Sequence, residues 1–565
     1  MLHLIPAVKS LKETGGTLAA TTLFVDKSTL TPRLLGALEK LPQSENGTPL
    51  TVTFGKGDGE GYTLTVTEGA VTITADSERG AFWAIQTLRQ LFEGNAVPTV
   101  EIEDAPDFAY RGFYHDVTRG KVATLDTLKG MIDKMAYYKM NALQLYVEHV
   151  FPFRETEALI EESSYLSPDE LQELDTYCQE RFIDFQPSLS TFGHLFELLE
   201  QPAYRHLRVL KDFEPTTCRW DDRMKHHTID PRDPASIEIV KSLIDQYIPL
   251  FSSEYFNICC DETFDLKEID PEGKLYVEFV NKIIAHVTAK GKRVMMWADI
   301  LLKHPNCITM LPEDTVFLNW NYRAEPPEEN IEAFCELDRR QIVCPGTTTW
   351  NRFCERVERE EQNILKMAEY GYRYGAIGML NTNWGDWGNP ASLECSYYGM
   401  VLGAAKSWTI KTAADEAFYA DVNALLYKNE NAMRYLTAIS AAHNDVSWTM
   451  VMRAAYLHKN GLPHEAPVTA EAVAAAQKTY LDMKAALAAD KWAHEDFKAE
   501  FLLAAEGVCL LAELGAVLAG IKAERLVNTE DFLTRYRAKW VEKNKESELS
   551  RMEEIFRYCD TVTVK

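Results

Sequence analysis

Residues 256–263 (FNICCDET) run from an apolar segment directly into two adjacent carboxylates, Asp261 and Glu262. An apolar run of this length is typical of a strand that is buried on both faces of a parallel sheet. Acids at the end of such a strand are costly to desolvate unless they face a cavity or meet partners. In a (β/α)8 barrel, the C-terminal strand ends carry the catalytic residues. The alternative is a solvated acid pair at the start of a loop, so the surrounding chain must decide.

Strand and helix patterns alternate from Tyr110 to about residue 381. We expect strands at residues 110–117, 142–147, 184–189, 255–260, 293–298, 316–321, 341–345 and 376–381. Helical patterns fill most of the gaps, for example at residues 125–138, 236–247 and 275–289. Eight strands over roughly 290 residues match the strand count and size of a TIM barrel.

The segments on either side of this region have different patterns. Residues 62–66 and 71–75 alternate with period two around a Glu-Gly turn, which predicts a hairpin, and an amphipathic helix is expected over residues 80–92. From about residue 415 the chain becomes alanine-rich and helical. The sequence therefore predicts an α/β fold, a (β/α)8 TIM barrel at residues 105–410, with an N-terminal α+β domain at 1–104 and a C-terminal helical domain at 411–565.

The expected strand ends collect acids and aromatic residues. They carry Glu148, His194, Asp261, Glu262, Trp297, Asp299, Trp320, Tyr322, Trp350, Trp384 and Asp386, and the first strand carries Arg111. Aromatic faces stack on sugar rings while carboxylates and arginine bind hydroxyls, so this mixture is typical of a sugar site. Each residue alone has a structural explanation: an ion pair for Arg111, a helix cap for His194, or a barrel plug for the tryptophans. Their joint recurrence at strand ends favours a site.

The composition narrows the class of partner. The chain has 59 Lys and Arg against 85 Asp and Glu, a net charge of -26, which argues against nucleic acid and against anionic membrane surfaces. No uninterrupted apolar run approaches the ~20 residues of a membrane span, and no signal segment is visible. Eleven scattered cysteines without a Cys-x-x-Cys pair indicate reduced thiols and no zinc site. We therefore expect a cytoplasmic protein.

Several blocks resemble one known family. Residues 105–113 (APDFAYRGF), 135–141 (MAYYKMN) and 256–262 resemble glycoside hydrolase family 20, the β-N-acetylhexosaminidases. Residues 80–88 (GAFWAIQTL) are similar to the accessory domain of that family, and residues 191–194 (TFGH) and 384–386 (WGD) resemble its intracellular hexosaminidase D-like branch. The resemblance covers roughly residues 1–405 and leaves the C-terminal helical region out.

The resemblance implies a role for each matched residue. Glu262 would be the general acid and Asp261 would orient and polarise the 2-acetamido group of the substrate. The remaining implied substrate contacts are Arg111 and Asp386 on hydroxyls, Trp297, Trp320 and Trp384 as pocket walls, and His194 with Glu148 as a supporting polar pair. Tyr322 is the candidate for the tyrosine that braces the acetamido group, with Trp350 as the alternative. Glu148 is followed by His149, where the family would have a second acid.

The activity implied by this resemblance is that of an exo-acting, retaining β-N-acetylhexosaminidase without metal or organic cofactor. Its partner would be a small glycan or glycoconjugate with terminal β-linked GlcNAc or GalNAc, and a homo-oligomer is possible. One alternative is a glycosidase with a direct carboxylate nucleophile, Glu148 or Asp299 acting with Glu262 at ~5–5.5 Å. The other is a non-catalytic sugar-binding barrel, which would have no need of a general acid.

Overall fold

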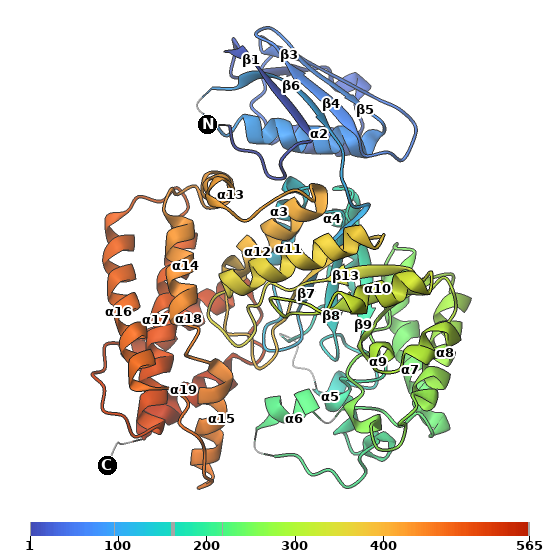
Figure 1. The fold of residues 1–565 in the computed structure, drawn as a ribbon, viewed down its shortest axis with the longest axis vertical. Coiled ribbons are helices and arrows are strands. Elements are labelled where there is room, and N and C mark those ends of the chain that lie inside the picture. Colours follow the sequence, from blue (N-terminus) through green and yellow to red (C-terminus); the bar gives the residue numbers. More distant parts are fainter. Residues whose placement is uncertain (1, 95, 160–163, 217, 226, 563–565) are drawn as a thin grey trace.

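The computed structural model describes residues 2–94, 96–159, 164–216, 218–225 and 227–562. In Figure 1, three parts follow one another along the chain: a sheet with a helix at the top, a barrel below it, and a group of long helices at the left. This is the (β/α)8 barrel with an N-terminal α+β domain and a C-terminal helical domain that the sequence predicts, and the predicted fold class is confirmed.

The N-terminal part is a mixed sheet with a helix on one face. Its strands are β1 (Ser10–Thr17), β2 (Leu23–Val25), β3 (Thr48–Phe54), β4 (Tyr62–Val66), β5 (Val71–Ala75) and β6 (Pro98–Asp104), in the order β1-β6-β4-β5-β3-β2. The predicted hairpin is confirmed, because β4 and β5 pair antiparallel with Tyr62 opposite Ala75. The short helix α1 (Pro32–Leu38) and the long helix α2 (Glu78–Leu91) complete the layer, and α2 buries almost its whole surface.

Among the described residues, eight parallel strands close the barrel. They are β7 (Tyr110–Asp116), β8 (Ala142–Val147), β9 (Asp184–Leu189), β10 (Tyr255–Asn257), β11 (Arg293–Trp297), β12 (Val316–Trp320), β13 (Gln341–Cys344) and β14 (Gly378–Asn383). The pairing of Asn257 with Ser188 joins β10 to β9 and completes the ring. The predicted end of β10 at residue 260 is wrong, since Cys259 and Cys260 have φ of 55° and 63°, which no strand accommodates. The last strand ends at Asn383 rather than at residue 381.

Helices surround the barrel and fill its loops. The outer layer contains α3 (Leu125–Tyr137), α4 (Pro168–Gln179), α7 (Pro234–Tyr247), α8 (Lys274–Ala289), α10 (Glu329–Glu336), α11 (Val357–Arg373) and α12 (Tyr397–Trp408). Three short helices, α5 (Phe196–Leu199), α6 (Arg219–Lys225) and α9 (Asp299–Lys303), instead follow strand ends. Figure 1 shows α5, α6 and α9 on the side of the barrel away from the N-terminal sheet.

The C-terminal part is a bundle around one apolar helix. It contains α13 (Glu416–Val422), α14 (Ala432–Ala442), α15 (Trp448–Lys459), α16 (Ala470–Ala489), α17 (Glu495–Leu518), α18 (Thr529–Lys543) and α19 (Leu549–Thr561). By length and composition alone, α17 could cross a membrane, but 89% of its most apolar segment is buried inside the protein. It packs against α14, α15, α16, α18 and α19, so its hydrophobicity is accounted for by the core of the bundle.

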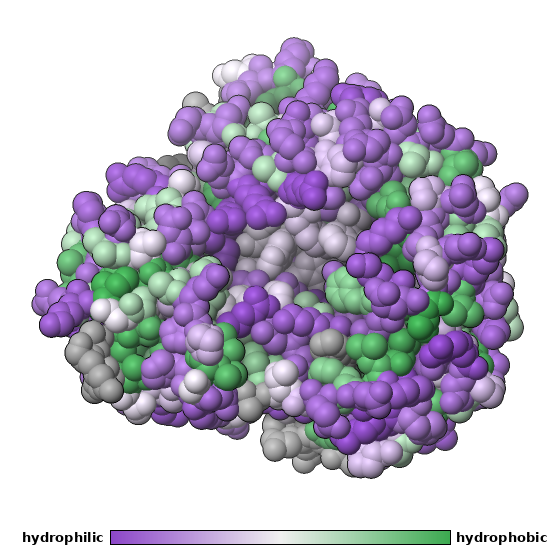
Figure 2. Space-filling model, turned by 60° about the horizontal axis from the view of Figure 1, so that its bottom comes forward, coloured by the Kyte–Doolittle hydropathy of each residue, from purple (hydrophilic) through white to green (hydrophobic). Residues whose placement is uncertain are grey.

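The two flanking parts contact different regions of the barrel. The N-terminal sheet covers the end where the strands begin, through ion pairs of Glu60 with Arg111 and of Asp104 with Lys139. The C-terminal bundle reaches the other end, where Trp448 Nε1 donates to the carbonyl of Trp387 at 2.6 Å. Because the N-terminal sheet covers only the end where the strands begin, the C-terminal strand ends form the open end of the barrel. Figure 2, which turns this end toward the viewer, shows a hollow with a pale floor between hydrophilic edges.

Candidate active site

The two carboxylates lie on a loop whose backbone is unusual. After β10, residues Cys259, Cys260 and Glu262 all have positive φ, an uncommon conformation for residues other than glycine that is enriched at functional sites. The loop is held by Asn257 Oδ1, which accepts from the backbone N–H of Cys259 at 2.9 Å, and by Asp299 Oδ2, which accepts from that of Glu262 at 3.2 Å. These bonds hold the loop that carries both carboxylates at the C-terminal end of the barrel strands.

The loop after β9 approaches this turn closely because it contains a glycine. A Cβ at Gly193 would lie 2.4 Å from the backbone oxygen of Asp261, so no other residue fits without movement. The next residue, His194, has φ of 57°, and its N–H donates to Nδ1 of His227 at 2.9 Å. The two imidazole rings stack with centroids 4.4 Å apart. This packing fixes the direction in which the His194 ring points.

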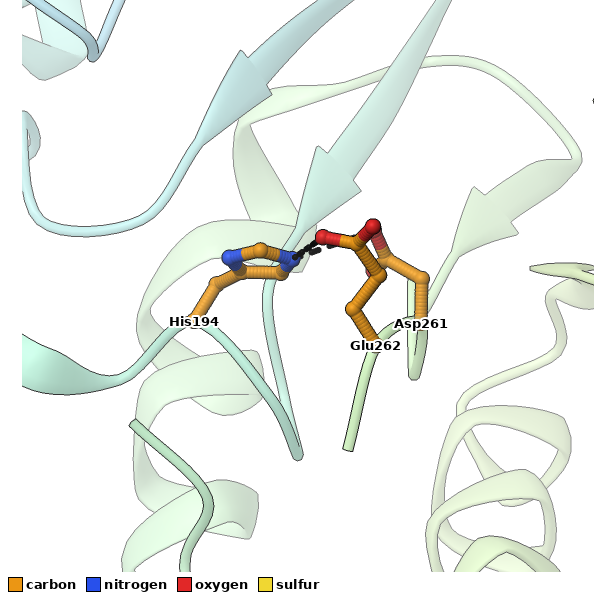
Figure 3. Close-up of side chains that lie close together, drawn as sticks. All are labelled: His194, Asp261 and Glu262. Carbon is orange, nitrogen blue, oxygen red and sulfur yellow. Dashed lines mark ion pairs between the residues drawn. The ribbon is translucent and has the colours of Figure 1, made fainter. Parts of the chain in front are cut away.

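Figure 3 shows His194 facing both carboxylates. Its Nε2 lies 3.3 Å from Oδ2 of Asp261 and 3.4 Å from Oε2 of Glu262, so the protonated ring forms ion pairs with both acids, although neither contact has hydrogen-bond geometry. Burial disfavours the charged ring, but the charge of Asp261 and the contacts with both acids outweigh it and raise the pKa of His194 to about 10. The side chain of His194 is fully buried, and Glu262 is more exposed (26%) than Asp261 (9%).

Arg119 joins the other acids of the site. Its guanidinium donates to Glu148 Oε1 at 3.1 Å and to Asp386 Oδ1 at 2.8 Å, and its Nη2 lies 3.1 Å from Nδ1 of His194. Nδ1 is also 4.0 Å from Glu148 Oε1. Because the raised pKa keeps the His194 ring charged at neutral pH, both of its nitrogens carry a proton, and Nδ1 faces Arg119 as a second cation among the surrounding carboxylates. The side chain of Glu148 is buried, so Glu148 and His194 support the acids from behind and do not line the opening.

Aromatic side chains make the floor and walls. Trp297 has no exposed surface and packs beneath Trp384, with ring centroids 5.7 Å apart. Trp384 is almost buried, and its Nε1 donates to the hydroxyl of Tyr322 at 2.6 Å. Tyr322 stacks on Trp320 at 5.1 Å and lies 5.0 Å from Trp350, and these three rings are half-buried. Trp320, Tyr322 and Trp350 therefore present ring surface toward solvent, while Trp297 supports the pocket from below.

A further carboxyl, Asp299, lies behind the catalytic loop. Burial, together with the charges of Asp261 and Glu262, raises the pKa of Asp299 to about 7. Asp386 is partly exposed, but desolvation still raises its pKa to about 6 although Arg119 opposes the shift. Asp299 and Asp386 thus lie close to other carboxyl groups in a site that is largely shielded from solvent. In this arrangement carboxyl groups take up protons near neutral pH.

Comparison with known proteins shows the family. The model of the glycosyl hydrolase family 20 catalytic domain matches residues 108–419, and that of family 20 domain 2 matches residues 1–105. The chain belongs to glycosyl hydrolase family 20. The predicted membership is thus confirmed, and the matched segments include the barrel and the N-terminal sheet.

Individual relatives agree with this membership. The chain is similar to a Beta-N-acetylhexosaminidase of Cellulomonas fimi, with 27% identity over 368 residues, 59% of this chain and 70% of that relative. It is similar to the Hexosaminidase D of Homo sapiens, with 24% identity over 225 residues, 35% of this chain and 44% of that relative. The matched segments cover 29% to 70% of the lengths of such curated relatives.

The fold similarity extends to the C-terminal helices. The X-ray structure of the Flavobacterium johnsoniae chitobiase matches 98% of this chain and 99% of that chain, with a TM-score of 0.62 and 17% sequence identity. At this level of identity the likeness shows the shared fold, in which the helical bundle belongs to the same architecture as the family 20 barrel.

One site prediction for this family 20 chain is wrong. Arg111 does not contact the pocket, because it is the second residue of β7 and so lies at the opposite end of the barrel. Its side chain is fully buried, pairs with Glu60 and donates to the backbone oxygen of Phe108 at 2.8 Å. The arginine at the open end is Arg119, which the sequence analysis missed. The signal that distinguishes the two arginines is their position, because Arg119 follows the predicted end of the first strand while Arg111 lies near its start.

The C-terminal bundle holds the loops around the family 20 pocket. Arg352, two residues after Trp350, donates to the backbone oxygens of Ser440 and His443 at 2.8 and 2.9 Å. On α6, the Arg223 guanidinium pairs with Glu548. Since Trp448 also binds the Trp387 carbonyl, the bundle fixes loops that follow three different strands. Sequence analysis predicted only that this region is a helical domain.

The donor set at the acids also has the composition of a metal site. One ligand atom each from His194, Asp261 and Glu262 lie within 4.8 Å of one another. Imidazole and carboxylate groups bind several divalent ions. The same atoms, however, form ion pairs with one another while His194 is charged, so a metal ion would have to displace the proton on His194 Nε2.

Proposed function

We propose that this chain is an exo-acting, retaining β-N-acetylhexosaminidase that removes terminal β-linked GlcNAc or GalNAc from small glycans by substrate-assisted catalysis. The observation that carries the proposal is the pair Asp261 and Glu262, joined by His194 at 3.3 and 3.4 Å at the open end of the barrel. Half-buried aromatic rings stand beside them, as a sugar site requires.

Glu262 is the general acid in this proposal. It is the more exposed of the two carboxylates, so its oxygen can reach the glycosidic oxygen of a bound substrate. As the bond to the anomeric carbon breaks, Glu262 gives its proton to the departing oxygen. His194 Nε2 lies 3.4 Å from Glu262 Oε2, so the charged ring stabilises the carboxylate that is left after the proton has gone. In the second step the ionised Glu262, next to the charged His194 ring, takes a proton from the attacking water.

The nucleophile is best supplied by the substrate itself. Glu148 is buried and engaged by Arg119 and by the hydroxyl of Tyr146, and Asp299 is buried and accepts from the Glu262 backbone. Neither carboxylate is placed to attack the anomeric carbon. In family 20, a recognised exception to the two-carboxylate scheme, the 2-acetamido oxygen attacks that carbon from within the same sugar. The intramolecular attack has the advantage of a very high effective molarity.

Asp261 then stabilises the intermediate. Attack by the acetamido oxygen closes an oxazolinium ring, in which positive charge develops toward the nitrogen, and an anion beside that nitrogen lowers the barrier. Tyr322 supports the acetamido oxygen in this arrangement, because its hydroxyl accepts from Trp384 Nε1 and keeps its own proton to donate. Trp350, in contact with the Tyr322 ring, remains the alternative brace. Arg119 and Asp386 bind hydroxyls of the same sugar.

Two substrates test the proposal. An aryl N-acetyl-β-glucosaminide should be hydrolysed with retention, while the aryl β-glucoside, which lacks only the acetamido group, should be inert. Asp261→Asn should lower kcat by orders of magnitude, because the amide keeps the shape but loses the charge. Glu262→Gln should lose most turnover on glycans and much less on substrates whose leaving group needs no proton.

The competing mechanism has a different signature. Efficient hydrolysis of the glucoside, or mass-spectrometric detection of a sugar covalently bound to Glu148 or Asp299, would contradict substrate assistance and favour a direct nucleophile. Binding of N-acetylhexosamines without turnover of any substrate would instead indicate a sugar-binding barrel.

A cytoplasmic location is part of the proposal. All eleven cysteines lie among the described residues and are free thiols. Ten of them are buried and Cys335 is exposed. Persistent free thiols are typical of a reducing compartment. Fractionation of cells that produce the protein, followed by the aryl N-acetylglucosaminide assay on each fraction, tests it.

A further inference from the structure

We propose that Phe264 is the stacking surface of a leaving-group subsite beside the general acid, so that the second sugar of the glycan lies against its ring. The proposal rests on the proposed function, because it assigns the position of the group that departs when Glu262 donates its proton. It adds a residue that selects substrates by the part beyond the cleaved bond.

The first observation is the exposure of this ring. The side chain of Phe264 is 43% exposed, and among the described phenylalanines only Phe24 is similarly open, at 44%. Phe264 stands two residues after Glu262, and its N–H donates to the Glu262 backbone oxygen at 2.7 Å. An exposed aromatic ring two residues from the proposed general acid, on the same loop, has the chemistry of a sugar-stacking residue.

The second observation is that the segment carrying the ring is held in place. Phe264 begins a short 3-10 turn, Phe264–Leu266, on the catalytic loop. Within it, Asp265 Oδ2 accepts from the backbone N–H groups of His227 and Thr228 at 3.2 and 3.0 Å. The ring is therefore presented on a fixed loop, which lowers the entropy lost when a ligand stacks on it.

The third observation gives the direction of the ring from the acid. The Phe264 ring lies 5.9 Å from the ring of His227, which in turn stacks on His194 at 4.4 Å. His194 faces Glu262, so Phe264 lies outward along the same series of rings, toward the rim. The leaving group occupies the side from which Glu262 protonates it, and a glycan emerging from the pocket meets this rim.

The chemistry of the rim defines the ligand class. Lys303, on the short helix α9, places its Nζ over the Phe264 ring, 5.9 Å from the ring centroid, and its side chain is well exposed. An apolar ring face beside an ammonium group suits a pyranose, whose C–H face stacks while its hydroxyls accept hydrogen bonds. We therefore assign a sugar residue, not a lipid or peptide, to the leaving-group position.

The experiment compares two substrates that share the terminal N-acetylglucosamine. One is the β-linked N-acetylglucosamine disaccharide, and the other is the methyl β-glycoside, whose leaving group also needs a proton from Glu262 but is too small to stack on the ring. In Phe264→Ala the ratio of kcat/KM on the disaccharide to kcat/KM on the methyl glycoside should fall about 3- to 10-fold, the range of one lost stacking contact. Phe264→Trp should keep the ratio at or above its original value.

Phe24→Ala is the matched control, because it removes an equally exposed ring from β2 of the N-terminal sheet, and it should leave the ratio unchanged. An unchanged ratio in Phe264→Ala would overturn the assignment, and so would equal losses on both substrates, which would mean that the substitution disturbs the acid itself. A wild-type protein that hydrolyses neither substrate would overturn the proposed function and this inference with it, an outcome distinct from turnover with an unaltered ratio.

Discussion

Arg111 lies near the start of β7 and Arg119 lies just after its end, and the two guanidinium groups have different partners. The Arg111 guanidinium lies between the rings of Trp83 and Trp408, 5.8 and 4.9 Å from their centroids, and pairs with Glu60 of the N-terminal sheet. The Arg119 guanidinium instead connects Glu148, Asp386 and His194 at the open end. Both are buried, so burial does not tell them apart.

The difference lies in what the partners do. Arg111 donates to backbone carbonyls and to a carboxylate of another domain, contacts that no substrate could replace, and it joins two domains. Arg119 shares its donors among side chains that converge on the catalytic pair, and one of these, Asp386, is partly exposed. A buried arginine is therefore assigned to function by the side chains it brings together and by the barrel end at which it lies.

The largest effect is expected from Arg119→Ala. It leaves Glu148 and Asp386 without their cation, and an unpaired buried charge costs about 3–5 kcal/mol. We expect kcat/KM on an aryl N-acetylglucosaminide to fall about a thousandfold, equivalent to about 4 kcal/mol. Arg119→Lys should retain only part of the wild-type kcat/KM, since lysine lacks the planar guanidinium group that bridges two carboxylates. An activity within tenfold of wild type would remove Arg119 from the site.

The counterpart is Arg111→Lys, which should change stability and not catalysis. We expect the free energy of unfolding to fall by about 3 kcal/mol. This is the lower end of the range for breaking a buried ion pair, because lysine keeps the positive charge. Urea denaturation measures it, and kcat/KM per folded molecule should stay within twofold. Lys12→Met, which breaks the exposed pair with Glu101, should cost under about 1 kcal/mol. A selective loss of activity in Arg111→Lys would contradict the assignment.

The same comparison shows what the sequence could and could not predict. The strands and the Asp261-Glu262 pair follow from periodicity and from one abrupt change of polarity. Arg111 was misassigned because its motif marks the family, whereas its place at the start of a strand decides its role. Arg119 lies in a loop without periodicity, and its partners come from positions up to 267 residues away in the chain. The positive φ of Cys259 and Cys260 likewise results from packing, which local propensity does not contain.

A smaller effect should separate the charge of Asp299 from its hydrogen bond. The pKa of about 7 in the folded state lies above the ordinary value of about 3.9, so Asp299 favours folding when protonated. Its contribution is fully present below pH 4 and is lost as the pH rises through 7. A shift of three units is worth up to about 4 kcal/mol, and we expect about half because Asp261 and Glu262 share the charge.

Asp299→Asn removes that charge and keeps an acceptor for the Glu262 N–H. The fall in unfolding free energy between pH 4.5 and pH 8.5 should therefore be about 2 kcal/mol smaller in Asp299→Asn than in wild type, measured by urea denaturation at each pH. Asp314→Asn, an exposed acid in the loop before β12, is the control and should leave the pH dependence unchanged. Identical pH profiles for wild type and Asp299→Asn would show that Asp299 is charged throughout.

The smallest effect is expected from metal removal, although His194, Asp261 and Glu262 form a possible ligand set. A ligating Nε2 must give up its proton, and the pKa of about 10 makes that cost about 4 kcal/mol at pH 7. The proton that remains on the ring would then be the one on Nδ1, which faces Arg119 Nη2 3.1 Å away. Dialysis against a chelator should therefore change kcat/KM less than twofold, and added Zn²⁺ or Mg²⁺ should not raise it. A large loss restored by one metal ion would make the open end a metal centre, and Arg119 would then serve to orient a ligating histidine.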